Sequence, residues 1–247
     1  MIFEWWKNNR RDLPWRRTHD PYKIVVSEIM LQQTQVSRVL PKYKEFLHHF
    51  PTLTSLTNAS PAAVLRVWKG MGYNRRALNL YKLAKFGKLP KSESELVKLP
   101  GLGKYTARAV LVFAYKKDIA IVDTNIRQII THFFFDDKPQ KESVIQGVAD
   151  QLLPKGKSWE WHQALMDYGA LELVRARKPA KQSVPFHRTN RFFRGQIIDR
   201  LRDKPLREKM LLRNLNKPRK HLKSLLDDLE ADGLITRSKT GIISLPE

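Results

Sequence analysis

The stretch LPGLGKYTAR, residues 99–108, decides how this chain is expected to fold. Two glycines flank a leucine directly after a proline, and this pattern predicts a tight hairpin that leads into a helix. Glycine permits turn conformations that a Cβ would block, and it lets an anion approach the backbone N–H groups at the helix start. Gly101, Leu102, Gly103 and Lys104 are therefore predicted to hold a phosphate. The alternative is an ordinary helix C-cap followed by a tight connection.

The net charge favours a nucleic acid as the source of that phosphate. The chain of 247 residues carries 46 Lys and Arg against 24 Asp and Glu, a formal charge of +22 at pH 7. Such a field attracts polyanions through counterion release, although a highly charged soluble surface is the simpler interpretation. The segment 175–194 favours the first reading, because it holds seven basic residues, no acid and interleaved aromatic residues. We expect double-stranded DNA as the partner.

Composition excludes several kinds of chemistry. The chain has no cysteine, so it has no disulfide, thiolate zinc site, iron–sulfur cluster or cysteine nucleophile. Its seven histidines form no pair at metal-ligand spacing, and we expect neither a metal nor a cofactor. No apolar run approaches the roughly 20 residues that span a bilayer, and the N-terminal region lacks a signal-peptide pattern. We expect a cytoplasmic, nucleoid-associated protein that does not contact membranes and is a monomer.

Hydrophobic spacing predicts helices along almost the whole chain. Apolar residues recur at three- and four-residue steps in segments such as 36–50 and 126–133. Prolines divide the pattern into short helices. We expect residues 1–178 to form an all-α region of two helical lobes without strands, followed by a basic linker at 179–189.

The last part of the chain, residues 190–247, has a different pattern. Apolar spacing predicts three helices, and the segments 234–237 and 241–245 read as a β-hairpin. Three helices and a hairpin resemble a winged helix, a small α+β module that binds DNA or serves as a protein-interaction module. The third helix begins basic and ends acidic, against the preference of its dipole, and a phosphate contact explains this order. The residues expected to contact phosphates are Arg219, Lys220, Lys223, Arg237 and Lys239.

Six motifs can be read along the chain: RDLPWR (11–16), DPYKIVVSEIMLQQTQV (20–36), GMGYNRRALNL (70–80), LPGLGKYTA (99–107), VDTN (122–125) and ALMDYGA (164–170). In order and spacing they resemble those of the helix-hairpin-helix DNA glycosylases, the HhH-GPD superfamily. The most similar branch is that of the MutY-type adenine glycosylases, which excise adenine opposite 8-oxoguanine. The resemblance covers residues 1 to about 178. This resemblance implies an all-α helix-hairpin-helix glycosylase fold, followed here by the winged-helix-like domain.

The chemistry of base excision gives two carboxylates distinct roles. Breaking an N-glycosidic bond needs a proton for the leaving base and negative charge beside the sugar cation. Glu28 lies in an apolar run, where burial would keep it protonated as the acid; a helix-surface glutamate is the simpler alternative. Asp123 is the candidate for the sugar side, or only a helix N-cap. Asn125 is expected to hold a water or a polar neighbour in the same pocket.

Tyr105 stands where the bifunctional glycosylase-lyases of the superfamily carry a lysine nucleophile. A phenol cannot form a Schiff base with the opened sugar, so we expect no lyase activity and assign Tyr105 to stabilising the sugar cation. Gln32, Gln33 and Thr34 resemble the family's wedge, which fills the space of the extruded base. Tyr73 resembles its intercalating tyrosine. Each of these side chains could instead be an ordinary surface or core residue.

The chain departs from the family pattern in two places. The four-cysteine iron–sulfur loop of relatives would begin near Leu173 and continue at Ala180, and neither residue is cysteine. The basic stretch 175–194 is expected to replace the DNA contact of that loop. MutY-type enzymes also carry a pyrophosphohydrolase-like domain that recognises 8-oxoguanine, whereas this chain has the winged-helix candidate at that end.

The sequence therefore predicts a monofunctional DNA glycosylase that removes mispaired adenine opposite 8-oxoguanine or G. The string MLQQTQV, residues 30–36, favours adenine. A thymine or uracil glycosylase acting at G mispairs is the alternative enzyme. A non-catalytic DNA-binding protein of the same fold is the alternative from another functional class.

Overall fold

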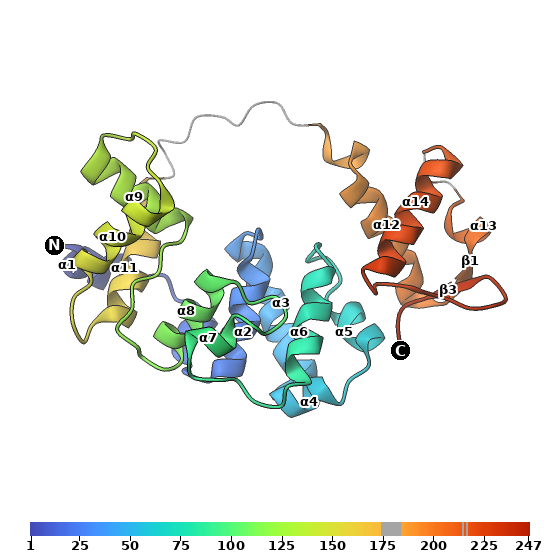
Figure 1. The fold of residues 1–247 in the computed structure, drawn as a ribbon, viewed down its shortest axis with the longest axis horizontal. Helices are drawn as coiled ribbons and strands as arrows, with labels where there is room; N and C mark the ends of the chain where they lie inside the picture. Colours follow the sequence, from blue (N-terminus) through green and yellow to red (C-terminus); the bar gives the residue numbers. More distant parts are fainter. Residues whose placement is uncertain (174–183, 214, 216) are drawn as a thin grey trace. The chain divides into compact units, whose positions relative to one another are not determined.

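The computed structural model describes residues 1–173, 184–213, 215 and 217–247. The described elements are helices apart from a small sheet (Figure 1). They form two compact units, of which unit 1 combines residues 1–29 with 89–180 and unit 2 combines residues 30–88 with 181–247. The chain passes from unit 1 to unit 2 within helix α2 (Pro21–Leu31).

Unit 1 is built around helix α11, which packs against α9 and α1 (Figure 1). Its elements besides most of α2 are α1 (Ile2–Asn9), the 3-10 helix η1 (Pro14–Arg17), α7 (Glu93–Leu96), α8 (Lys104–Phe113), α9 (Thr124–Phe135), α10 (Glu142–Leu152) and α11 (Ser158–Leu171). As the sequence predicts, the described residues 1–173 form no strand.

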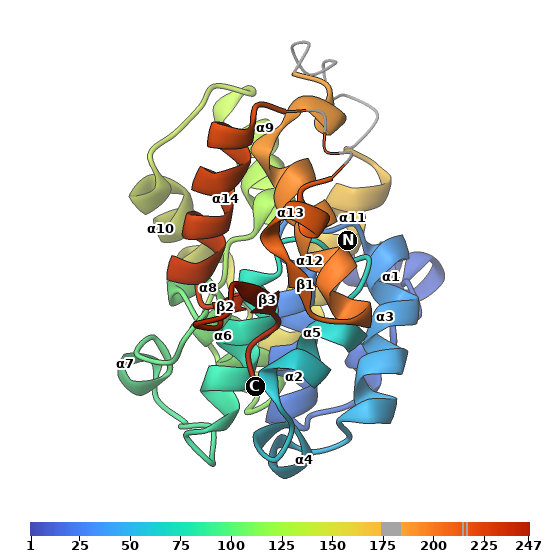
Figure 2. The same cartoon turned by 90° about the vertical axis from the view of Figure 1, so that its right-hand side faces the viewer.

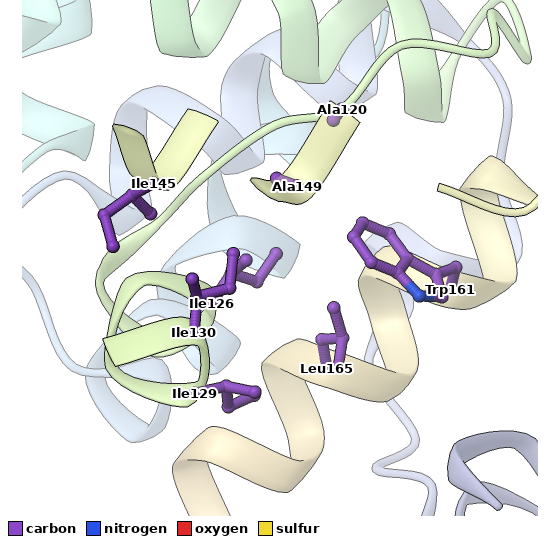
Figure 3. Packing of buried hydrophobic residues seen from close by; sticks show 8 residues of the cluster. All are labelled: Ala120, Ile126, Ile129, Ile130, Ile145, Ala149, Trp161 and Leu165. Carbon is purple, nitrogen blue, oxygen red and sulfur yellow. The ribbon is translucent and has the colours of Figure 1, made fainter. Parts of the chain in front are cut away.

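A cluster of buried apolar side chains holds α9, α10 and α11 together (Figure 3). Its members are Ala120, Ile126, Ile129, Ile130, Ile145, Ala149, Trp161 and Leu165. The isoleucines of α9 lie at three- and four-residue steps and so share one face of the helix. Burying such a side chain fully contributes roughly 1.5–3 kcal/mol. The cluster therefore anchors α9 from its first turn onward, directly after Asp123.

Unit 2 combines helices from the middle of the sequence with the C-terminal segment. Its elements are α3 (Val36–His49), α4 (Leu53–Thr57), α5 (Pro61–Val67), α6 (Arg75–Ala84), the 3-10 helix η3 (Phe186–Arg188), α12 (Asn190–Asp203), β1 (Leu206–Arg207), α13 (Glu208–Leu211), α14 (Arg219–Ala231), β2 (Thr236–Arg237) and β3 (Ile242–Ser244). Figure 2 shows α14 in red beside α12 in orange, a pair that is in contact.

The small sheet contains the predicted hairpin and one further strand. β3 lies in the centre, in the order β1-β3-β2, and both pairings are antiparallel. Leu206 pairs with Ile243, and Thr236 pairs with Ser244. Ile243 is 1% exposed, so the inner face of the hairpin packs into unit 2. Hydrophobic alternation cannot predict β1, because a strand of two residues has no period to detect.

The C-terminal segment packs on helix α5 rather than standing alone. Arg202 of α12 is buried, and its side chain donates to the Leu65 carbonyl oxygen at 3.0 Å and to Asn74 Oδ1 at 3.2 Å. Arg66 Nε donates in turn to the Arg202 carbonyl oxygen at 3.0 Å. Burial lowers the pKa of Arg202 to about 10. Residues 190–247 therefore share one unit with the middle of the chain.

The two units cut across the predicted domains 1–178, 179–189 and 190–247. Contacts, unlike sequence order, place residues 30–88 with the C-terminal segment. The predicted boundaries, taken as the limits of separate domains, stay a prediction. Part of the expected linker, 179–183, lies outside the described residues, and the remainder contains η3.

The prediction that prolines separate helices is wrong at one proline. Pro41 lies inside α3, where its missing N–H removes one intrahelical hydrogen bond. The buried side chains Val39, Tyr43 and Phe46 hold this helix on both sides of the proline. Among the described residues, no helix is both long and apolar enough to cross a membrane.

Candidate active site

The hairpin of residues 99–103 has the geometry of a type II turn. The Leu102 N–H donates to the Leu99 carbonyl oxygen at 3.2 Å, and Pro100 and Gly101 occupy the central positions. Gly101 has φ +83°, a conformation that side chains with a Cβ rarely adopt. The prediction that this glycine permits the turn is confirmed.

The second glycine leaves the start of α8 open. Gly103 is the N-cap of α8 with no side-chain cap, and a Cβ there would meet nothing within 4 Å. The first N–H groups of a helix lack intrahelical partners and can bind an anion. Lys104 is exposed beside them. Leu102 is 4% exposed, so any DNA contact from this residue has to use its backbone.

Glu28 of α2 is buried, as its apolar sequence neighbourhood predicts. Glu28 is only 9% exposed. Burial, and then the negative charge of Asp123, raise the pKa of Glu28 to about 8. A carboxyl group with this pKa holds its proton at neutral pH and can deliver it to a leaving group.

Asp123 is the N-cap of α9, and its side chain accepts hydrogen bonds through both oxygens. Oδ1 accepts from the Ile126 N–H at 2.7 Å, and Oδ2 accepts from Asn125 Nδ2 at 2.9 Å. Burial raises the pKa of Asp123 above its ordinary value, while these hydrogen bonds and the positive charge of Arg11 act in the opposite direction. The capping role holds, and it leaves the carboxylate close to Glu28.

Tyr105 of α8 is the third member of the site. The residue is 36% exposed, yet the pKa of its phenol lies well above its ordinary value because of desolvation and the charges of Glu28 and Asp123. The phenol therefore stays protonated near both carboxyl groups. Helices α2, α8 and α9 thus bring together in unit 1 the four residues that the sequence assigns to catalysis: Glu28, Tyr105, Asp123 and Asn125.

Helix α11 positions the start of α9 through residues that sequence reasoning missed. His162 is fully buried, and its Nε2 accepts from the Ile121 N–H at 2.9 Å while its Nδ1 faces the Ser158 carbonyl oxygen at 2.6 Å. Burial lowers the pKa of His162 to about 4, so the ring stays neutral. Gly169 lies so close to Asn125 that an added Cβ would be 2.7 Å from Asn125 Cβ.

A buried ion-pair cluster ties the N-terminal segment to α11. Asp167 is 0% exposed and accepts from Trp6 Nε1 at 2.8 Å, from Arg16 Nη1 at 2.7 Å and from Arg11. Burial alone would raise the pKa of Asp167, but Arg16, Arg11 and the indole N–H outweigh it and lower the pKa. The motifs RDLPWR and ALMDYGA meet here. The local sequence pattern of these motifs does not predict an ion pair between residues about 150 positions apart.

The predicted wedge residues lie in unit 2, in a turn beyond the end of α2. Gln33 has φ +53° and Tyr73, just before α6, has φ +45°. These left-handed conformations cost residues with a Cβ on the order of 1 kcal/mol each, and such strain tends to occur at functional positions. The backbone thus holds two of the predicted DNA-contacting residues in unusual conformations.

Arg76 joins the wedge turn to the loop before α6. Its guanidinium is buried and donates to the Met30 carbonyl oxygen at 2.9 Å, to Thr34 Oγ1 at 3.0 Å and to the Gln32 carbonyl oxygen. It also donates to the Met71 carbonyl oxygen at 3.2 Å. Sequence reasoning missed this residue, although it lies inside the motif GMGYNRRALNL, because its role depends on contacts with a distant turn.

The basic residues of the C-terminal segment have different surroundings. Arg219, Lys220 and Lys239 are exposed, and Lys223 approaches Glu208 at 3.8 Å. Arg237 pairs with Asp227 and Glu230 of α14. Arg237 is therefore a nearby positive partner for the acidic end of α14. Exposed ion pairs contribute little to stability. They therefore leave these side chains able to contact DNA.

The described residues contain no group of three or more side chains suited to a metal ion. The chain also lacks the cysteines that would ligate the iron–sulfur cluster implied by the family resemblance. Its donor set therefore does not fit that cluster. The Leu173 carbonyl oxygen, where the cluster loop would begin, accepts from Gln128 Nε2 at 3.0 Å. Ala180 and most of the basic stretch lie outside the described residues.

Comparisons with known proteins place the chain in a family. The model of the HhH-GPD superfamily base excision DNA repair protein matches residues 26–154. The adenine DNA glycosylase of Mycolicibacterium smegmatis is 34% identical over 278 aligned positions, which cover 99% of this chain and 94% of that protein. A thymine/uracil-DNA glycosylase of Methanothermobacter thermautotrophicus is 31% identical over 72% of this chain and 85% of that protein. The solved structure of a thermostable thymine-DNA glycosylase matches with a TM-score of 0.66 and 31% identity, over 72% of this chain and 86% of that one.

Proposed function

Because the chain belongs to the HhH-GPD superfamily of base excision DNA repair proteins, we propose that it is a DNA glycosylase that removes adenine from mispairs with 8-oxoguanine or G. The observation that carries this proposal is the pair of carboxyl groups in unit 1. Glu28 is held protonated by burial, and Asp123 beside it accepts hydrogen bonds at a helix N-terminus.

The proposed reaction is hydrolysis of the bond between C1′ of the deoxyribose and the adenine nitrogen. Glu28 gives its proton to the imidazole ring of the base, which leaves with the bonding electrons. The negative charge of Asp123 and the oxygen of Tyr105 stabilise the sugar cation. A water oxygen then joins C1′ and releases a proton to the carboxylate left on Glu28. Asn125 holds the Asp123 carboxylate in place through its 2.9 Å hydrogen bond.

The absence of strand cleavage is a separate part of the proposal. A Schiff base with the sugar needs an amine, and Tyr105 supplies a phenol in a position where its proton is held firmly. The product should be an intact abasic strand that breaks only in hot alkali, and borohydride should trap no enzyme–DNA adduct. Efficient trapping would reject this part, and Lys104 would be the first nucleophile to test.

Adenine is favoured as the excised base by the relatives. The similarity to an adenine glycosylase extends over 99% of the chain, whereas that to a thymine/uracil glycosylase covers 72%. The second relative and the solved thymine-DNA glycosylase make thymine or uracil opposite G the second candidate. A panel of duplexes that place A, T, U or hypoxanthine opposite G or 8-oxoguanine distinguishes the two. Release of T or U but not A would overturn the adenine assignment.

The C-terminal segment is proposed to be a winged-helix-like module that contacts DNA. In support, α12, β1, α13 and α14 are followed by the β2–β3 hairpin, and all strands join one antiparallel sheet. Arg219, Lys220 and Lys223 lie at the N-terminal end of α14, the helix expected to meet the phosphates. The expected setting, a monomer on chromosomal DNA in the cytoplasm, belongs to the same proposal.

A further inference from the structure

A cleft of about 680 Å³ lies within unit 2 between the wedge residues and the C-terminal segment. Gln32, Gln33 and Tyr73 line it from the first half of the chain, and Arg191 and Gln196 line it from α12. Its volume lies in the range of small-ligand sites, about 300–1,000 Å³. The C-terminal segment therefore forms one wall of the cleft at which the predicted intercalating tyrosine is placed.

Arg191 lies directly over the ring of Tyr73. Its guanidinium carbon is 4.2 Å from the Tyr73 ring centroid and 5.2 Å from that of Phe186. Arg191 Nη1 donates to the Tyr73 hydroxyl, which uses one of the five donors of the guanidinium. Among the described residues no carboxylate pairs with Arg191, whereas Arg194, three positions further along α12, is paired with Asp232.

A second positive charge reaches the same ring. The Arg76 guanidinium carbon lies 5.2 Å from the Tyr73 centroid. Burial lowers the pKa of Arg76 to about 10, and the positive charge of Arg191 acts in the same direction. Arg76 donates to backbone carbonyl oxygens, so Arg191 is the cation with donors to offer a ligand. The cleft thus has at its edge a planar set of hydrogen-bond donors that is stacked on an aromatic ring.

We propose that Arg191 determines which base is accepted opposite the excised adenine, by donating hydrogen bonds to a guanine-type base that enters this cleft. The ring of Tyr73, which lies under Arg191, holds the guanidinium at the edge of the cleft. The O6 atom of guanine or 8-oxoguanine accepts from the guanidinium, and the N7 atom of guanine accepts a second bond. This proposal deepens the proposed function and rests on it. It assigns to α12 the discrimination that MutY-type enzymes are expected to make with their own C-terminal domain.

A DNA phosphate is the other acceptor that an exposed arginine could meet. We favour the base because Arg191 is stacked on an aromatic ring inside a cleft lined by amide side chains. The two acceptors differ in what they read, because a phosphate contact carries no sequence information whereas a contact with a base edge depends on which base is present.

The test compares Arg191→Ala and Arg191→Lys with the wild type on duplexes that place A opposite G, 8-oxoguanine, C or T. Lys209→Ala is the matched control, since Lys209 is exposed on α13 and does not line the cleft. Single-turnover release of adenine is measured for each duplex. The Kd for each duplex is measured in the Glu28→Gln background, where excision is blocked. Thermal unfolding checks that each variant is folded.

Arg191→Ala should reduce the preference for G over C and T by about 5- to 150-fold, the discrimination expected of a good bidentate contact, and should reduce the preference for 8-oxoguanine less, because only its O6 accepts. Arg191→Lys should keep part of the preference, since lysine can also donate to these acceptors. Lys209→Ala should keep the preference of the wild type. A loss of affinity in Arg191→Ala that is equal for all four duplexes, with the preference among them unchanged, would identify a phosphate contact and overturn the proposal. A wild type that excises adenine equally well opposite all four bases would also overturn it. A wild type that excises no adenine would instead overturn the proposed function.

Discussion

Glu28 and Asp123 are two carboxyl groups in different surroundings, and this difference assigns their roles. Burial and a neighbouring negative charge both favour the protonated form of Glu28. Burial raises the pKa of Asp123 as well, but here the Ile126 N–H, the Asn125 amide and the charge of Arg11 act in the opposite direction. This contrast supports the proposal that Glu28 is the acid and that Asp123 stabilises the sugar cation.

The raised pKa of Glu28 predicts a pH-dependent cost to stability. Between the ordinary pKa of 4.5 and the folded-state pKa of about 8, the folded protein binds more protons than the unfolded chain. The contribution of Glu28 to the free energy of unfolding therefore falls as the pH rises through this window. Glu28→Gln removes the effect, so the variant should gain stability over the wild type from about pH 5 to pH 8, by up to a few kcal/mol at about 1.36 kcal/mol per pKa unit.

Urea denaturation of both proteins at these pH values measures the difference. His162 titrates in an overlapping window with the opposite sign, because its pKa is lowered from 6.5 to about 4. It is present in both proteins and cancels in the comparison. A stability difference that does not change with pH would show that Glu28 titrates normally.

Asp123→Asn separates electrostatic catalysis from helix capping. Asparagine is nearly isosteric and can still accept the hydrogen bond from the Ile126 N–H, so the melting temperature should change little. The negative charge is lost, and excision should fall by about 100-fold or more. Single-turnover kinetics and thermal unfolding give the two readouts. A lower melting temperature with undiminished excision would make Asp123 a structural residue only.

At the scale of helices, α11 acts as the platform for the catalytic end of α9. His162 fixes the backbone at Ile121, and Gly169 allows α11 to approach Asn125 closely. Asp123 lies between these two points of support in the sequence. Its position therefore depends on residues of α11.

Gly169→Ala should disturb the site from a distance. The new Cβ would lie 2.7 Å from Asn125 Cβ and 3.1 Å from the Asn125 backbone, so the start of α9 must shift. We expect a lower melting temperature and a loss of excision of at least about 10-fold, because small misplacements of catalytic groups are costly. Gly147→Ala on α10 is the matched control.

In the control the new Cβ meets nothing within 4 Å. Alanine should stabilise that helix by about 0.5–1 kcal/mol and leave excision unchanged. Equal excision by wild type and Gly169→Ala would reject the positioning role of α11.

The elements that the sequence predicts well are those with a strong local pattern. The helices of unit 1, the turn at Gly101 and the β2–β3 hairpin follow from spacing and glycine chemistry. The roles of Arg76 and Asp167 are not predicted, because their partners are distant in sequence. The local sequence pattern around an arginine or aspartate on a helix does not tell whether its side chain is exposed or buried. Glu28 and Asp123 were identified through the motifs around them, but only the structure gives the burial that separates their pKa values from ordinary ones.

At the scale of the whole molecule, the residues proposed for chemistry lie in one unit and those proposed for DNA contacts lie in both. Glu28, Asp123 and the hairpin 101–104 belong to unit 1, while the residues predicted to form the wedge and the basic end of α14 belong to unit 2. The C-terminal segment cannot be removed cleanly, since Arg202 is buried against Leu65 and Asn74. Its role in DNA binding is better tested by removing exposed charges.

The double substitution Arg219→Ala and Lys220→Ala should weaken binding to any duplex. Each lost phosphate contact lowers the slope of log affinity against log salt by about 0.9, so the pair should lower it by about 1.8. Single-turnover excision at saturating enzyme should change little, because neither residue is among those proposed to carry out the reaction. Fluorescence anisotropy titrations at several salt concentrations measure the slope. An unchanged slope would reject the phosphate contacts of α14.

The most direct test of the account is single-turnover release of adenine from a duplex with A opposite 8-oxoguanine, by the wild type and by Glu28→Gln. The wild type should release adenine and leave an abasic strand. The variant should bind the duplex with the same Kd but release adenine at least about 100-fold more slowly, as expected for a lost general acid. Equal rates in the two proteins, or no release by the wild type, would contradict the claim that Glu28 drives adenine excision.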